Sequence, residues 1–138
     1  MTKKALDLNL GFNSEDDLFN TLKMFFNEPD LKKTVKYSLT DFSSKDKLIE
    51  LKTRRCGYNS FSTTIVGLNK CEHYKNQKNM CCYFVFNFLN DKTIYYIKYD
   101  SELFNTFDIE NTYIFRDNKK EPKTNIHIPI KYLKKVII

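Results

Sequence analysis

Three charged residues in one short stretch have the types and spacing needed for metal-assisted chemistry on a phosphate. Glu50 and Lys52 lie two positions apart in a segment that alternates like a β-strand, so their side chains project to the same face. The polar run 43–46 predicts a turn, and a hairpin there would bring Asp41 close to Glu50. Two carboxylates and one ammonium would then meet at one place on a sheet.

This grouping suits a divalent cation such as Mg²⁺ or Mn²⁺. Mg²⁺ takes hard oxygen ligands and keeps several of its waters. The carboxylates of Asp41 and Glu50, with the backbone carbonyl of Leu51 between them, could supply three such ligands. A bound ion lowers the pKa of its water, and Lys52 would orient that water or stabilise the transition state. The alternative is a solvated strand face, because the acid-x-Lys pattern is common.

The flanking segments predict the elements that would hold this hairpin. Ser14 is a good N-cap for a helix with apolar residues at helical spacing, and Pro29 is expected to end that helix. Alternating or aromatic-rich runs predict strands, and a longer amphipathic run predicts a second helix. The expected strands are 35–42, 47–54, 80–89 and 93–99, and the expected second helix is 63–78.

The remainder of the chain predicts fewer regular elements. Residues 100–111 are expected to form a loop with a short helical turn, and strands at 113–115 and 125–128 to flank a charged loop, 116–123. A terminal helix is expected over 129–135, with a proline at its first position. No linker or repeat divides the 138 residues. The order of elements therefore predicts one α/β domain with a mixed central sheet flanked by helices.

The motif and the order of elements together resemble the PD-(D/E)xK nuclease superfamily, which has the restriction-endonuclease-like fold. The matching residues are Asp41 and the triplet Glu50-Leu51-Lys52, and the resemblance covers roughly residues 14–99, the family's αβββαβ core. It implies Mg²⁺-dependent cleavage of DNA, or less often RNA. Asp41 and Glu50 would be metal ligands and Lys52 the catalytic lysine. Thr40 stands where the name-giving proline of the family would be.

The resemblance also implies further site residues. Some members add a metal-ligating acid from the first helix, for which Glu15 is the candidate, although an acid in a first helical turn is favourable for dipole reasons alone. A polar residue on the next helix often joins the site, and Lys70 is the candidate there. Other basic or polar side chains could contact nucleic-acid phosphates, with a solvated surface as the alternative: Thr53, Arg54, Arg55, Lys70 and Lys75.

Composition adds weaker indications about partners and location. The formal net charge of +6 is compatible with a polyanionic partner such as DNA or RNA. The excess of Lys over Arg, 20 to 3, points to an AT-rich genome such as that of a virus or parasite. No apolar run is long enough to span a membrane, and the N-terminus lacks the apolar core of a signal peptide. We therefore expect an intracellular protein with no membrane association.

The four cysteines are expected to be reduced thiols, as is usual inside cells. A zinc site is the alternative, although the spacing matches no Cys-x-x-Cys pair. Its ligands would come from Cys56, Cys71, Cys81, Cys82 and His73.

Two other functions compete with the nuclease. One is a nucleic-acid-binding or structural module on the same scaffold that has lost catalysis. The other is a small protein-interaction domain in which the Glu-Leu-Lys triplet is accidental. For an active enzyme that cuts both strands of a duplex, a homodimer would match the two-fold substrate.

Overall fold

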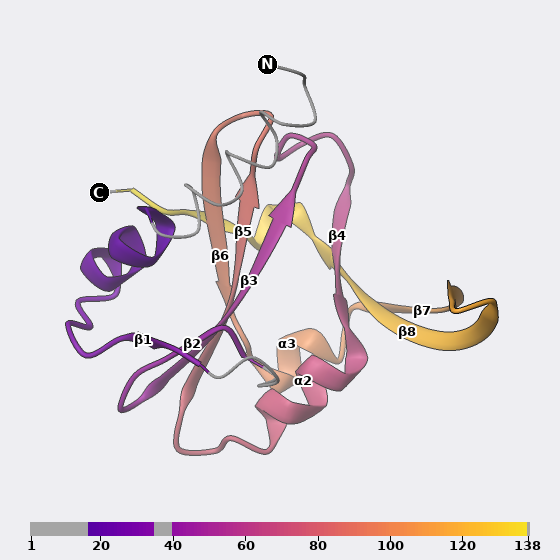
Figure 1. Ribbon diagram of the computed structural model, residues 1–138, viewed down its shortest axis with the longest axis horizontal. Helices are drawn as coiled ribbons and strands as arrows, with labels where there is room; N and C mark the ends of the chain where they lie inside the picture. The colour runs from indigo at the N-terminus through magenta and orange to yellow at the C-terminus, as the bar shows by residue number, and fades with distance from the viewer. Residues whose placement is uncertain (1–16, 35–39, 138) are drawn as a thin grey trace.

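The computed structural model describes residues 17–34 and 40–137 (Figure 1). Its central sheet has six strands in the order β1-β2-β3-β5-β6-β9. Neighbouring strands are antiparallel except β3 and β5, which are parallel. The protein is therefore α/β with a mixed central sheet, as expected. The strands are β1 (Lys32–Lys33), β2 (Phe42–Ser43), β3 (Lys47–Arg54), β5 (Cys81–Phe88), β6 (Thr93–Lys98) and β9 (Lys134–Lys135).

A second sheet of three strands lies beside the central one, in the order β4-β8-β7. Its strands are β4 (Thr63–Gly67), β8 (Lys119–Pro129) and β7 (Asp108–Arg116), all antiparallel. The chain leaves β3, passes through β4 and the helix α2 (Leu68–Lys75), and returns as β5. This crossover makes the parallel pairing of β3 and β5 possible, since parallel strands need a long connection.

Both faces of the central sheet pack against other elements of the fold. On one face, Ile49 and Val85 pack against Leu18 and Leu22 of the helical residues 17–25. The other face presents Phe84, Phe86 and Phe88 to α2 and to the second sheet. A polar side chain of β3 on this second face must therefore share space with aromatic rings.

The strand at 47–54 is confirmed, and the strands expected at 80–89 and 93–99 lie within one residue of β5 and β6. The strand expected at 35–42 is largely outside the described residues, and only its last residue, Phe42, belongs to β2. The first helix ends at residue 25, not at Pro29, because Asn27 takes a left-handed backbone conformation (φ 52°). Ser14, its expected N-cap, lies outside the described residues.

The expected helix over 63–78 is wrong in its first part. Residues Thr63–Gly67 form β4 and pair with β8, and α2 begins only at Leu68. The run Thr63-Thr64-Ile65-Val66 consists of β-branched residues, which lose side-chain freedom in a helix and pack well on a sheet. Its strand partner, Asn125–Pro129, is distant in sequence, so the local pattern alone could not identify it.

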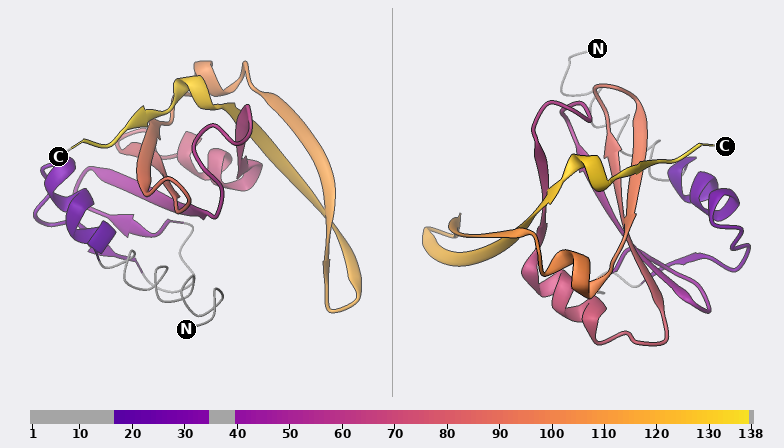
Figure 2. Two further views of the ribbon diagram at one scale, coloured as in Figure 1. Left: turned by 90° about the horizontal axis from the view of Figure 1, so that it is seen from above. Right: turned by 180° about the vertical axis from the view of Figure 1, so that it is seen from behind.

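The C-terminal expectations are also corrected. The short strands at 113–115 and 125–128 are parts of one long hairpin, and the expected charged loop 116–123 contributes to both strands. Its turn is only Asp117-Asn118, both with positive φ (51° and 63°), a geometry that Asp and Asn tolerate better than most residues. The ribbon projects far from the body of the molecule (Figures 1 and 2).

The end of the chain is not the helix expected over 129–135. A 3-10 turn, η1 (Ile130–Tyr132), leads into β9, which pairs with β6. The short helical turn expected within 100–111 is present as α3 (Ser101–Phe104), whose N-cap Asp100 accepts a hydrogen bond from the Glu102 N–H. Among the described residues, every helix is too short or too polar to cross a lipid bilayer.

Candidate metal centre on the β2–β3 hairpin

Alternation along β3 places Glu50, Lys52 and Arg54 on the sheet face that carries the aromatic core. Glu50 is paired in register with Phe84, and Lys52 with Phe86. Only 4% of Glu50 is exposed, although it is a charged residue. A carboxylate this deeply buried is expensive unless it has charged partners, so its surroundings need an explanation.

Asp41 immediately precedes β2, and its carboxylate lies near that of Glu50 on β3. Phe42 pairs with Ile49, but the Asp41 N–H also points to Ile49 and donates to its carbonyl (3.0 Å), so the ladder is irregular at Asp41 and does not continue in register to Glu50. The Asp41 carboxylate also accepts a hydrogen bond from the Leu51 N–H at Oδ2 (2.7 Å). The hairpin thus brings the two carboxylates together, as the sequence predicts.

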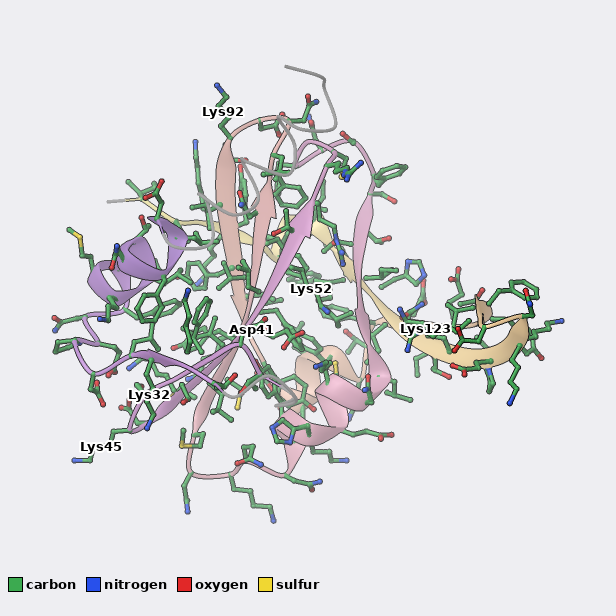
Figure 3. The ribbon with its side chains drawn as sticks, viewed as in Figure 1. Lys32, Asp41, Lys45, Lys52, Lys92 and Lys123 are labelled. Atoms are coloured by element: carbon green, nitrogen blue, oxygen red, sulfur yellow. The ribbon has the colours of Figure 1, made fainter. Side chains whose placement is uncertain are left out.

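Two lysines neutralise the buried Glu50 carboxylate. The Lys52 Nζ lies 3.1 Å from Glu50 Oε1, and the Lys70 Nζ, which comes from α2, lies 3.6 Å from the same oxygen. Figure 3 shows Asp41 and Lys52 near the middle of the molecule, where β2 and β3 meet. The structure therefore brings four of the expected site residues together, with α2 supplying the fourth.

Burial and the nearby Asp41 together outweigh the two lysines in their effect on the pKa of Glu50. Burial raises the pKa of Glu50, and the nearby Asp41 carboxylate raises it further. Lys52 and Lys70 lower the pKa but do not reverse the shift. An additional positive charge between the two carboxylates would relieve their repulsion, and a divalent cation is the simplest such charge.

The donor set fits Mg²⁺ or Mn²⁺ by its chemistry. The carboxylates of Asp41 and Glu50 and the carbonyl of Leu51 are hard oxygen donors, and Asp41 is exposed, so water can complete a coordination shell. Glu15, the further expected ligand, lies outside the described residues. Within residues 17–34 and 40–137, no group of three His, Cys, Asp or Glu side chains is placed to hold a metal. The expected site is not a group of this kind, because it consists of two carboxylates and one backbone carbonyl.

The other residues expected to contact nucleic acid take different positions. Thr53 is on the opposite face of β3 from Glu50, because neighbouring strand residues alternate. Arg55 follows the strand end and is exposed, and Lys75 is exposed at the end of α2. The structure does not bring these three side chains to the carboxylates.

Arg54 shares the face of Glu50 but is bound to the second sheet. Its Nη2 donates to the Ile65 carbonyl (2.7 Å), and its guanidinium lies over the Phe86 ring, 5.9 Å from the centroid. Burial lowers the pKa of Arg54. This side chain therefore joins β3 to β4, whatever else it contacts.

Sequence reasoning missed Tyr74, which borders the same site. Tyr74 follows Lys70 by one helical turn on α2, is 3% exposed, and donates its hydroxyl hydrogen bond to the Tyr83 carbonyl (2.8 Å). Burial raises the pKa of Tyr74, and the negative charge of Glu50 adds to the effect. The sequence signal for Tyr74 was its i, i+4 spacing from Lys70, which places both side chains on one side of the helix. Lys70 contacts the Glu50 carboxylate and Tyr74 contacts β5.

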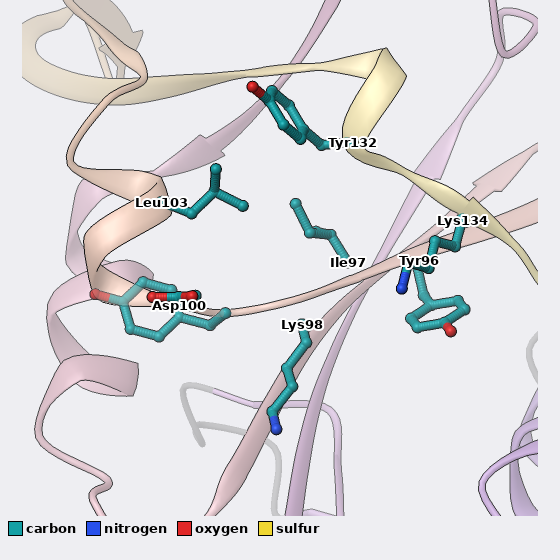
Figure 4. Close-up of a pocket in the computed structure, with 8 residues that line it drawn as sticks. Tyr96, Ile97, Lys98, Asp100, Leu103, Tyr132 and Lys134 are labelled. Atoms are coloured by element: carbon teal, nitrogen blue, oxygen red, sulfur yellow. The ribbon is translucent and has the colours of Figure 1, made fainter.

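Cavity size alone does not identify this site. A cavity of about 530 Å³ lies between β6, α3, η1 and β9 (Figure 4). It is lined by Tyr96, Ile97, Lys98, Tyr99, Asp100, Leu103, Tyr132 and Lys134. None of the described candidate residues lines it, so we base the assignment on the charge arrangement at the hairpin.

The four cysteines are all free thiols. Cys71 and Cys82 are buried in the aromatic core, and burial raises their pKa to about 12 and about 11, respectively. Thiols with pKa values this high are poor nucleophiles and poor metal ligands at neutral pH, because both roles need the thiolate.

Comparison with known proteins adds no assignment: no protein-family model, curated protein or solved structure matches this chain.

Proposed function

We propose that this protein is a metal-dependent nuclease that hydrolyses phosphodiester bonds, with DNA as its substrate. The observation that carries the proposal is the pair Asp41 and Glu50, whose carboxylates are held near each other on one hairpin with Lys52 beside them. The order of elements supports it. A helix, three antiparallel strands, the helix α2 and a strand parallel to β3 follow one another as in the PD-(D/E)xK core, with β4 inserted before α2.

Each residue of the site has a distinct role in this proposal. Asp41, Glu50 and the Leu51 carbonyl would hold Mg²⁺ or Mn²⁺, which when bound supplies an acidic water and stabilises developing negative charge. The Lys52 ammonium, with 29% of its side chain exposed, donates to the attacking water or to a phosphate oxygen. Lys70 keeps Glu50 ionised and oriented from the helix side.

Cleavage of plasmid and branched DNA with Mg²⁺ or Mn²⁺ tests the proposal directly. Lys52→Ala and Glu50→Ala should each lower the cleavage rate by about 10²–10³-fold, since each removes a charged group from the reacting centre. Lys92→Ala is the matched control, because Lys92 is an exposed lysine in the β5–β6 turn, far from Lys52 (Figure 3). Equal rates for the wild type and both site variants would overturn the assignment.

One observation favours a second candidate, a nucleic-acid-binding module without catalysis. The two lysines already neutralise Glu50, so this buried carboxylate is tolerable without any metal. Titration calorimetry with Mg²⁺ and Mn²⁺ separates the two. If the wild type binds either ion and Glu50→Gln does not, the result supports the nuclease. DNA binding by a protein that takes up neither ion supports the inactive module.

A further inference from the structure

The β7–β8 ribbon has an end that touches little of the body of the molecule. Residues 111–124, here called the arm, comprise the last part of β7, the Asp117-Asn118 turn and the first part of β8. Most of its side chains are exposed, including large apolar ones: Tyr113 is 56% exposed and Phe115 is 76% exposed. A folded ribbon with exposed aromatic rings is expected to have a partner.

Cations lie on both sides of the arm. Phe115 pairs with Lys120 and Tyr113 with Pro122, which puts Lys120 on the aromatic side, where its Nζ lies 4.1 Å from the centroid of the Tyr113 ring. The opposite side carries Arg116, Lys119 and Lys123. Arg116 pairs with Lys119 across the ribbon, and Lys123 pairs with Thr112. The arm holds these four cations against two acids, Asp117 and Glu121.

The base of the arm lies on the far side of α2 from the candidate metal centre. A hollow of about 390 Å³ separates it from α2, with Leu68 and Asn69 on the helix side and Pro122 and Lys123 on the arm side. Lys70 of the same helix contacts Glu50. One helix therefore lies between the arm and the carboxylates, and the arm bends away from the body beyond β4 (Figure 2).

We infer that the arm lies in a groove of double-stranded DNA while the candidate metal centre engages the backbone. Paired strands are about 4.8 Å apart, so a ribbon with its side chains fits a major groove of about 12 Å. With the face that carries Phe115 toward the groove floor, Phe115 contacts base edges such as the thymine methyl group, and the long side chains of Lys120 on that face and of Lys119 and Lys123 on the other extend past the ribbon edges to phosphates of the groove walls. The inference rests on the proposed function and narrows its substrate to a duplex.

The direct test compares binding to a 30-base-pair duplex and to one of its strands, in Ca²⁺ so that binding is measured without turnover. The triple variant Lys119→Ala/Lys120→Ala/Lys123→Ala should lose at least tenfold in duplex affinity, and its log–log salt slope should fall by about 0.9 per lost phosphate contact. The matched control is Lys32→Ala/Lys45→Ala/Lys92→Ala, three exposed lysines outside the arm (Figure 3). This control should keep most of the duplex affinity.

Phe115→Ala provides an independent arm variant that carries no charge change. It should weaken duplex binding by several-fold at every salt concentration and leave the salt slope unchanged, because an apolar contact releases no counterions. The substitution is at an exposed position, so the fold should be retained, which circular dichroism verifies.

The outcomes separate this inference from the proposed nuclease activity. Wild-type cleavage with Mg²⁺ together with unchanged duplex binding by both arm variants would overturn the arm inference and leave the nuclease intact. If the wild type never cleaves DNA but the arm variants lose duplex binding, the arm inference stands and the proposed nuclease activity is overturned. A wild-type dimer that Phe115→Ala converts to a monomer would assign the arm to a second copy of the chain and overturn the inference.

Discussion

The Asp41 carboxylate is held by the backbone N–H of Leu51, at 2.7 Å, between the two charged residues of the motif. This bond places Asp41 against the Glu-Leu-Lys triplet even though β2 contains only two residues. A hydrogen bond to a backbone amide constrains the carboxylate without using a charged partner. We therefore expect the hairpin, and not the rest of the sheet, to determine how the Asp41 and Glu50 carboxylates lie relative to each other.

Glu50 should make the protein less stable as the pH rises in metal-free buffer. Its pKa is raised in the folded state, so the folded protein holds this proton more tightly than the unfolded chain. Its contribution is therefore most favourable below the unfolded pKa, near the ordinary value of 4.5, and is lost as the pH rises through the folded pKa.

Urea unfolding of wild type and Glu50→Gln in EDTA, from pH 4 to pH 8, measures this effect. The free energy of unfolding of Glu50→Gln relative to wild type should increase with pH across that window. Glu121→Gln, at an exposed position of the arm, is the control and should show no such trend. A constant difference between Glu50→Gln and wild type at all pH values would contradict the raised pKa.

Divalent ions should stabilise the folded protein through the same carboxylates. At a concentration 100 times its dissociation constant, an ion that binds only the folded state adds about 2.7 kcal/mol. For a chain of this size that corresponds to a rise in Tm of about 5–10 °C. Asp41→Asn and Glu50→Gln should each abolish most of the rise in differential scanning fluorimetry, whereas Asp117→Asn should keep it. An undiminished rise in both site variants would place the ion elsewhere.

Lys70 should determine how far the pH can fall before metal-dependent activity is lost. Its ammonium lowers the pKa of Glu50, so Lys70→Met should raise that pKa further. Metal binding needs the carboxylate form, and the pH at which binding reaches half its maximum should therefore move upward. Lys75→Met, on the exposed end of the same helix, should leave the profile in place. Calorimetric titrations between pH 5 and pH 8 distinguish the two variants.

Arg54 should matter for stability because it joins the two sheets. Arg54→Met leaves the Ile65 carbonyl without this donor and removes a charge-assisted hydrogen bond, at a cost of about 1.5–3 kcal/mol. Arg116→Met is a matched substitution at an exposed position and should stay within about 0.5 kcal/mol of wild type. Chemical denaturation gives both values, and similar effects of the two substitutions would argue against the sheet-joining role.

The parts of the fold that could be predicted are those with local patterns. Alternation in Lys47–Arg54 and the aromatic run of β5 specify strands, and the spacing of Glu50 and Lys52 specifies that their side chains share a face. Lys70 was named as a helix residue near the site, and it lies at Glu50. In each case the deciding information is within a few residues of the element itself.

The parts that could not be predicted depend on distant partners. β4 is a strand because β8 pairs with it, and its short apolar run is compatible with either helix or strand when taken alone. The sequence predicts a loop over 116–123, because the turn that the structure shows there, Asp117-Asn118, lacks the glycine that marks most tight hairpins. Tyr74 could not be identified as a neighbour of the site, since its approach to Glu50 exists only after α2 packs on the sheet.

The position of the carboxylates on one hairpin also bears on the order of assembly. Asp41 and Glu50 are nine residues apart, so closing their loop costs little chain entropy and takes microseconds or less in a collapsing chain. Lys70 reaches Glu50 only when the crossover through β4 and α2 docks on the sheet, which is a long-range and slower event. We therefore expect the acid pair to form before its helix-borne counter-charge, and divalent ions present during refolding to accelerate the steps that bury Glu50.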